Sequence, residues 1–219
     1  MSTAHVRHLI DYIEAELPQG VWPHWTEGWP REIEAGLLDA AFSARATYGT
    51  PTSGVRAVIA RWRAHRGEPL DDLAALAEYA DEPAALIAVL DNRQRVPGNY
   101  TTKAEAVALA ARSLVAAGCR QSSELRDEEV RRNALVQIAG FGNATWECFT
   151  MQLGVCIPES RELLKDFVID ALAPEVEVTS TTADELLAAA ATRLDVSPAT
   201  LTHAIWRYQR AQRRLAGAR

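Results

Sequence analysis

Apolar residues recur every three or four positions along almost the entire chain, and few architectures other than packed helices accommodate that period. Alternation of apolar and polar residues, which is typical of strands, is scarce. The one candidate strand, Val176-Glu177-Val178, is too short to define a sheet, and we interpret it as a linker. The apolar stripes lie in residues 6–17, 37–42, 55–62, 104–115, 130–138, 163–172 and 201–208. The sequence therefore predicts an all-α protein with about eight to ten helices.

Local signals mark where several helices begin. Thr102 is followed by Glu105 at the spacing of a capping box, and Thr182 is followed in the same way by Glu185. Ser197-Pro198 predicts another start, because proline is favoured at the first helical position. Glycine or proline interrupts the pattern within residues 17–31, 48–54, 66–69, 96–102 and 139–143. These breaks predict short loops between the helices.

Composition limits the classes of protein that fit this chain. The hydrophobic fraction of 48% and the charged fraction of 24% are ordinary for a globular protein, and no run approaches the roughly 18 apolar residues of a membrane span. We expect a cytoplasmic protein without a membrane partner. The net charge of −6 gives no overall attraction to nucleic acid, so a phosphate-binding surface has to be a local basic patch.

The three cysteines do not form a recognisable ligand set. Cys119, Cys148 and Cys156 include no CxxC pair, which argues against a disulfide framework and against a four-thiolate zinc or iron–sulfur site. We expect all three to be buried thiols. The histidines show no metal-ligand spacing either.

The most informative stretch runs from Leu135 to Trp146, where an apolar helix end meets a Gly-x-Gly turn and a second helix begins at once. Glycines permit a tight hairpin with positive φ, and the second helix presents its first backbone N–H groups at the turn. Such a turn binds a phosphate through main-chain hydrogen bonds, aided by the helix dipole. The alternative is a plain helix–helix corner with a glycine cap. We expect Trp146, just after the turn, to be a core residue.

This stretch resembles the hairpin of the endonuclease III and helix-hairpin-helix DNA glycosylase superfamily. Four further blocks are similar to that family in the same order. They are the early helix 37–47 ending in Ser-Ala-Arg-Ala-Thr, the tyrosine loop and Lys-Ala helix start 100–106, the buried Met-Gln-Leu-Gly-Val at 151–155, and the closing segment 194–208. The resemblance extends over residues of about 34 to 210.

The resemblance implies a two-lobed helical fold that grips double-stranded DNA and acts in base-excision repair. Lobe A would comprise about residues 1–35 plus 160–219, and lobe B about 36–159 with the hairpin at 135–146. Tyr48 and Tyr100 would contact a flipped base, and the protein would associate with the nucleoid. The DNA-binding residues expected are Gly140, Phe141, Gly142, Asn143, Ala144, Thr145 and Arg161. Arg207 and Arg210 are further candidates, because the tail 201–219 carries arginines and no acidic residue; the alternative is a solvated charged helix end.

The chain departs from the family at its catalytic positions. The family's aspartate lies seven residues after the glycine that ends the buried helix, and this count from Gly154 reaches Arg161. A guanidinium neither accepts a proton from water nor neutralises a cationic sugar, so Glu159 is the catalytic candidate. Ala144 replaces the lysine of the strand-cleaving members, so lyase chemistry is not expected. The family's four-cysteine cluster is missing, so no iron–sulfur cofactor is expected. The family's hairpin often binds a monovalent cation, and whether this hairpin does so is left open by the sequence.

Three functions remain open from the sequence. The chain is a DNA N-glycosylase using Glu159, a catalytically silent module that binds DNA structure or lesions, or a helical scaffold without a DNA role, which the net charge favours. A monomer is favoured. The tryptophans of one loop either pack on the core or stack on nucleic-acid bases; they are Trp22, Trp25 and Trp29. A basic cluster is either ordinary surface charge or a further contact to nucleic acid; it comprises Arg56, Arg61, Arg63, His65 and Arg66.

Overall fold

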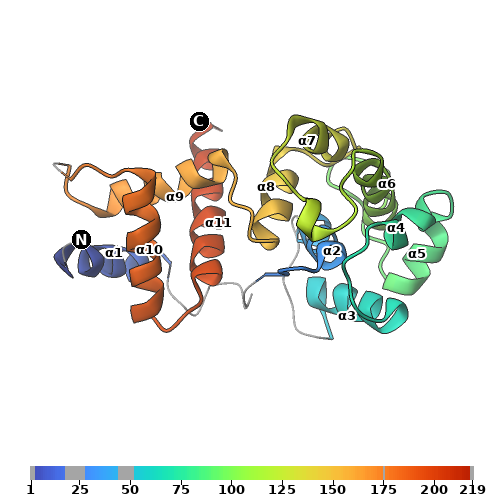
Figure 1. The fold of residues 1–219 in the computed structure, drawn as a ribbon, viewed down its shortest axis with the longest axis horizontal. Helices are drawn as coiled ribbons and strands as arrows, with labels where there is room; N and C mark the ends of the chain where they lie inside the picture. Colours follow the sequence, from blue (N-terminus) through green and yellow to red (C-terminus); the bar gives the residue numbers. More distant parts are fainter. Residues whose placement is uncertain (1–2, 18–27, 44–51, 175, 218–219) are drawn as a thin grey trace. The chain divides into compact units, whose positions relative to one another are not determined.

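The computed structural model describes residues 3–17, 28–43, 52–174 and 176–217, and within them the chain is all-α, as predicted (Figure 1). These residues form eleven α-helices and no strand; one isolated antiparallel bridge joins Arg95 to Thr102. The count exceeds the predicted eight to ten, and one of the helices, α4, is a single turn of four residues. The helices are α1 (Thr3–Glu16), α2 (Ile33–Phe42), α3 (Gly54–Arg66), α4 (Ala74–Ala77), α5 (Pro83–Leu90), α6 (Lys103–Ala116), α7 (Glu129–Val136), α8 (Asn143–Gln152), α9 (Pro158–Ala171), α10 (Ser180–Arg193) and α11 (Pro198–Gly217).

Two of the three predicted helix starts are confirmed. The hydroxyl of Thr102 accepts a hydrogen bond from the Glu105 N–H at 3.2 Å and caps α6, and α11 begins at Pro198. The prediction for Thr182 is wrong, because α10 begins at Ser180 and Thr179 is its N-cap. The Thr179 hydroxyl accepts from the Thr182 N–H at 3.1 Å. In a run of four hydroxyl residues, the first one in extended conformation takes the cap.

The chain divides into two compact units, which are described separately. Unit 1 comprises residues 1–27 and 156–219, and unit 2 comprises residues 28–155. In unit 1, α9 packs against α10, α11 and α1. Its core is apolar, with Leu9, Phe167, Leu186 and Ile205 fully buried. The predicted lobes had boundaries near residues 35 and 159.

Unit 2 is built around α2, all of whose residues are buried against α3, α6 and α8. Two carboxylates of α2, those of Glu34 and Asp39, are buried in the core. Glu34 accepts hydrogen bonds from the Trp62 indole at 2.7 Å and from the Asp72 N–H at 3.0 Å. Burial raises the pKa of Glu34, while these hydrogen bonds act in the opposite direction. Satisfied in this way, the carboxylate ties α2 to α3 and to the segment before α4.

The expectations for Trp146 and the cysteines are tested by burial. Trp146 is a core residue, as predicted. Cys119 and Cys148 are buried, but Cys156 is exposed, so the expectation of three buried thiols is wrong. Cys156 lies in the short connection between α8 and α9 rather than on a helix face that packs. Among the described helices, none is long and apolar enough to cross a membrane.

Candidate nucleic-acid interface

The turn between α7 and α8 has the geometry of a tight hairpin. The N–H of Phe141 donates to the carbonyl of Ile138 at 2.9 Å, which closes the turn. Gly140 has φ of +83°, and a Cβ there would lie 2.5 Å from Cβ and Cγ2 of Val96. Glycine is therefore required at this position both by conformation and by space. Gly142 differs, because its φ of −159° is extended backbone open to any residue, and the expectation of positive φ holds only for Gly140.

The N-terminus of α8 offers backbone donors to solvent. The carbonyl of Gly142 accepts from the N–H groups of Thr145 at 2.8 Å and Trp146 at 3.1 Å. The N–H groups of Asn143 and Ala144 have no acceptor within the described part of the chain, and both residues are exposed. Gly140 is exposed too, whereas the ring of Phe141 is buried, so Phe141 presents only backbone to a ligand. The turn thus combines open amides with the positive end of a helix dipole.

A second loop lies directly against this turn. Residues 94–103 form a narrow loop, closed by hydrogen bonds from Lys103 N to Gln94 O at 2.7 Å and from Val96 N to Thr101 O at 3.0 Å. Val96 is buried, and the contact with Gly140 fixes the loop beside the hairpin. The loop carries Tyr100, whose exposed fraction is 87%.

Two arginines on or next to this loop supply positive charge. The guanidinium of Arg95 lies 5.6 Å from the ring centroid of Tyr100, and Arg93 precedes it on the same exposed segment. In the described residues neither arginine has a carboxylate partner. Sequence reasoning missed both residues. The available signal was a pair of arginines before a Pro-Gly turn, but only the contact between Val96 and Gly140 connects them with the hairpin.

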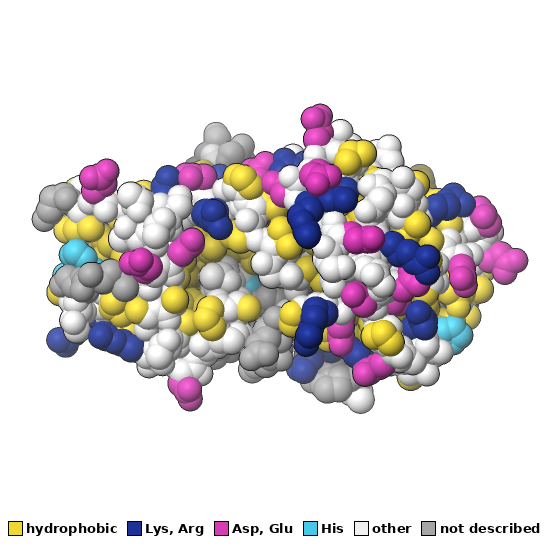
Figure 2. Space-filling view, viewed as in Figure 1, with side chains coloured by type: hydrophobic (Ala, Val, Ile, Leu, Met, Phe, Trp, Pro, Cys, Tyr) yellow, Lys and Arg dark blue, Asp and Glu magenta, His cyan; other side chains and the backbone are white. Residues whose placement is uncertain are grey.

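The arginines of α7 itself are already neutralised. Arg131 lies 3.2 Å from a Glu128 carboxylate oxygen, and Arg132 donates to Asp127 at 2.9 Å. Figure 2 shows acidic and basic side chains interspersed over the helices of unit 2 on this face. The uncompensated positive charge near the turn therefore comes from the 94–103 loop and its flank.

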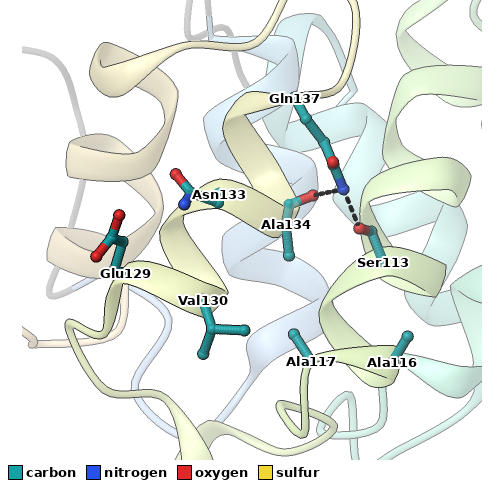
Figure 3. Close-up of a pocket in the computed structure, with 8 residues that line it drawn as sticks. All are labelled: Ser113, Ala116, Ala117, Glu129, Val130, Asn133, Ala134 and Gln137. Carbon is teal, nitrogen blue, oxygen red and sulfur yellow. Dashed lines mark hydrogen bonds between the residues drawn. The ribbon is translucent and has the colours of Figure 1, made fainter.

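A groove along the other side of α7 has a different character (Figure 3). Its volume is about 710 Å³, and Gln137 crosses one end by donating to the hydroxyl of Ser113 at 2.8 Å. Val130 points into it with 56% of its surface exposed. The lining residues include Glu129 and no cation: Ser113, Ala116, Ala117, Glu129, Val130, Asn133, Ala134 and Gln137. This groove does not attract phosphate, so the candidate interface is confined to the hairpin end of α7.

The remaining predicted site residues belong to unit 1 or lie outside the described residues. Glu159 and Arg161 are exposed in the first turns of α9, and Arg161 Nε is 3.9 Å from a carboxylate oxygen of Asp184. Arg207 is exposed on α11, and Arg210 lies over the Trp206 ring at 5.8 Å. Tyr48, Trp22 and Trp25 lie outside the described residues. Within unit 2, the contact between Val96 and Gly140 places the loop that carries Tyr100 against the hairpin.

Burial shifts the pKa values of two titratable side chains, Lys103 and His203. Burial lowers the pKa of Lys103, whose amine donates to the Phe42 carbonyl at 3.0 Å at the end of α2. Burial, together with nearby Arg207, lowers the pKa of His203 to about 3. The described residues contain no cluster of three or more His, Cys, Asp or Glu side chains suited to a metal ion.

Comparison with known proteins gives a family without an assigned activity. The family described as a domain of unknown function, DUF8548, matches residues 7–210, and the chain belongs to this family. No curated protein and no solved structure matches the chain.

Proposed function

We propose that this member of the DUF8548 family binds double-stranded DNA through the α7–α8 turn and the 94–103 loop. The observation that carries the proposal is the exposed pair of free amides at Asn143 and Ala144, on a turn whose Gly140 contacts Val96 of the loop that carries Arg95 and Tyr100. Each part has a matching element on a DNA strand. The amides and the helix dipole suit a phosphate oxygen, and the arginines suit the neighbouring phosphates.

Tyr100 gives the proposed interface a contact to bases. An aromatic ring that is almost fully exposed gains little from the protein core, and it stacks well on an unpaired base. The Asn99 side chain accepts hydrogen bonds from the N–H of Thr101 at 3.0 Å and from its hydroxyl at 2.9 Å, which stiffens the loop beneath the ring. We therefore extend the proposal to DNA in which a base is unpaired or easily extruded.

The resemblance to the helix-hairpin-helix glycosylases extends the proposal to base recognition in repair. In that version, Glu159 assists hydrolysis of the N-glycosidic bond. The competing candidate is a catalytically silent module that recognises damaged or distorted DNA. It is favoured by Arg161 at the position of the usual acid, where the cation pairs with Asp184, and by Ala144 at the position of the lyase amine.

Binding is tested with a labelled duplex by fluorescence anisotropy at low salt. Arg93→Ala and Arg95→Ala should each weaken binding severalfold, because each removes an unpaired cation beside the turn. Arg112→Ala is the matched control, since this exposed arginine is already paired with Asp81 at 2.8 Å. Equal affinities for all three variants and the native chain would exclude the proposed interface.

Catalysis is tested on duplexes containing uracil, alkylated purines, hypoxanthine or oxidised guanine, with alkali to reveal abasic sites. Activity that disappears in Glu159→Gln, while binding persists, supports the glycosylase. Inactivity of the native chain on all of these duplexes, with binding retained, supports the silent module. If no duplex is bound at all, the scaffold alternative stands.

A further inference from the structure

A small pocket between α3 and Trp29 shares no lining residue with the hairpin or the 94–103 loop. It has a volume of about 350 Å³, at the small end of the range for ligand sites. Five of its residues lie at helical spacing on one stripe of α3, and Trp29 forms the opposite wall. The lining consists of Trp29, Arg56, Ile59, Ala60, Arg63 and Ala64.

Trp29 is a fixed wall. Its indole N–H donates to a carboxylate oxygen of Asp39 at 2.8 Å, and its backbone N–H donates to the carbonyl of Gln152 at 2.7 Å. Both partners are buried on helices of the unit 2 core. The side chain is nevertheless partly exposed, so the pocket has a preorganised aromatic surface beside the apolar Ile59.

The arginines of α3 differ in whether they have partners. Arg63 donates to Glu32 and Glu68, Arg61 donates to the Leu90 carbonyl and lies 3.7 Å from Asp91, and Arg66 lies 3.8 Å from Glu34. Arg56 has no hydrogen-bond or ion-pair partner in the described part of the chain. It stands seven residues before Arg63, about 10 Å along the helix. The pocket therefore carries one uncompensated positive charge, located at one end of an apolar wall.

We propose that this pocket binds a nucleotide, with the base stacked on Trp29 next to the exposed Ala60 and Ala64, and the phosphate on Arg56. A planar ring gains most from a fixed indole, and a guanidinium fork matches two phosphate oxygens. A neutral apolar ligand would leave Arg56 without a partner, and a simple inorganic anion would leave the aromatic wall uncovered. A free mononucleotide and the phosphorylated end of a DNA strand carry this same chemistry.

The test titrates the full-length chain with AMP and follows the indole N–H resonances by NMR. The chain has six tryptophans, and the resonance that is missing in Trp29→Phe identifies Trp29. We expect AMP to shift this resonance saturably, and Arg56→Ala to weaken binding about tenfold or more, because it removes a charge-assisted hydrogen bond. Ala60 is exposed, so Ala60→Leu fills the pocket without disturbing the core and should abolish binding at an unchanged melting temperature.

Arg61→Ala is the matched control and should bind AMP as the native chain does, because Arg61 does not line the pocket. Arg95→Ala should also leave AMP binding intact, which separates this site from the proposed DNA interface. The affinity for a 5′-phosphorylated oligonucleotide is compared with the affinity for AMP. Tighter binding of AMP indicates that the site takes a free mononucleotide, and tighter binding of the oligonucleotide indicates that it takes the end of a DNA strand. The proposal is overturned if neither probe shifts Trp29, or if Arg56→Ala and Ala60→Leu both bind as tightly as the native chain.

Discussion

Replacing Gly140 with alanine places a methyl group where the hairpin has neither the conformation nor the space for it. An L-residue at φ of +83° costs about 1–2 kcal/mol. The new Cβ would also lie 2.5 Å from two carbon atoms of Val96, and relieving such overpacking costs about 1–3 kcal/mol. The free energy of unfolding should therefore fall by about 2–5 kcal/mol, a large part of the 5–15 kcal/mol of a typical domain.

The measurement is urea unfolding followed by circular dichroism, with Gly142→Ala as the matched control. Gly142 has an extended backbone and no atom within 4 Å of an added Cβ, but it is the N-cap of α8, where alanine is less favourable than glycine, so its variant should lose at most about 1 kcal/mol. At a temperature where both variants are folded, Gly140→Ala should also bind duplex DNA more weakly, because the methyl group pushes the 94–103 loop from the turn. Equal unfolding free energies for the two alanine variants would refute the geometry of this turn.

Three further predictions concern stability and thiol reactivity. Burial lowers the pKa of His203 to about 3 in the folded chain, whereas a histidine in the unfolded chain has a pKa of about 6.5. Between these two pH values the unfolded state binds one more proton, so the free energy of unfolding should fall by about 1.4 kcal/mol for each unit by which the pH is lowered. His203→Leu should flatten this pH dependence, while His8→Gln, at an exposed position, should keep it. Burial raises the pKa of Cys119 to about 11 and also raises the pKa of Cys156, which is nevertheless the exposed thiol. A thiol reagent at pH 8 should therefore modify Cys156 in the folded chain and Cys119 only after unfolding; equal rates would contradict the burial of Cys119. Thr102→Ala should lower the unfolding free energy by about 1 kcal/mol in the same urea assay, because the N-cap of α6 is lost; an unchanged value would mean that this cap does not stabilise the helix.

Helical periodicity was sufficient to predict the fold class, and the Gly-x-Gly turn between two apolar helices predicted the hairpin. The starts of α6 and α11, the burial of Trp146 and the turn between α7 and α8 all follow from signals within a few residues of each other. Local signals were ambiguous at α10, where four consecutive hydroxyl residues compete for one cap. The all-α prediction was confirmed because every apolar stripe in the described helices packs on another helix.

The composition of the candidate interface was not predictable, because it depends on contacts between distant segments. Val96 and Gly140 are far apart in the sequence, and only their contact places the loop that carries Arg95 and Tyr100 beside the hairpin. For the same reason, the sequence does not indicate which arginines of α3 are paired with carboxylates and which are not. Arg63 is neutralised by Glu32, which lies on the segment before α2, and no local pattern indicates that pair.

The salt dependence of duplex binding tests the central claim most directly. If Arg93 and Arg95 and the exposed turn bind phosphates, the logarithm of the association constant should fall linearly with the logarithm of salt concentration, with a slope of about −2 or steeper. Each of Arg93→Ala and Arg95→Ala should reduce that slope by about 1. Binding that is indifferent to salt, or a slope that both variants leave unchanged, would contradict the account.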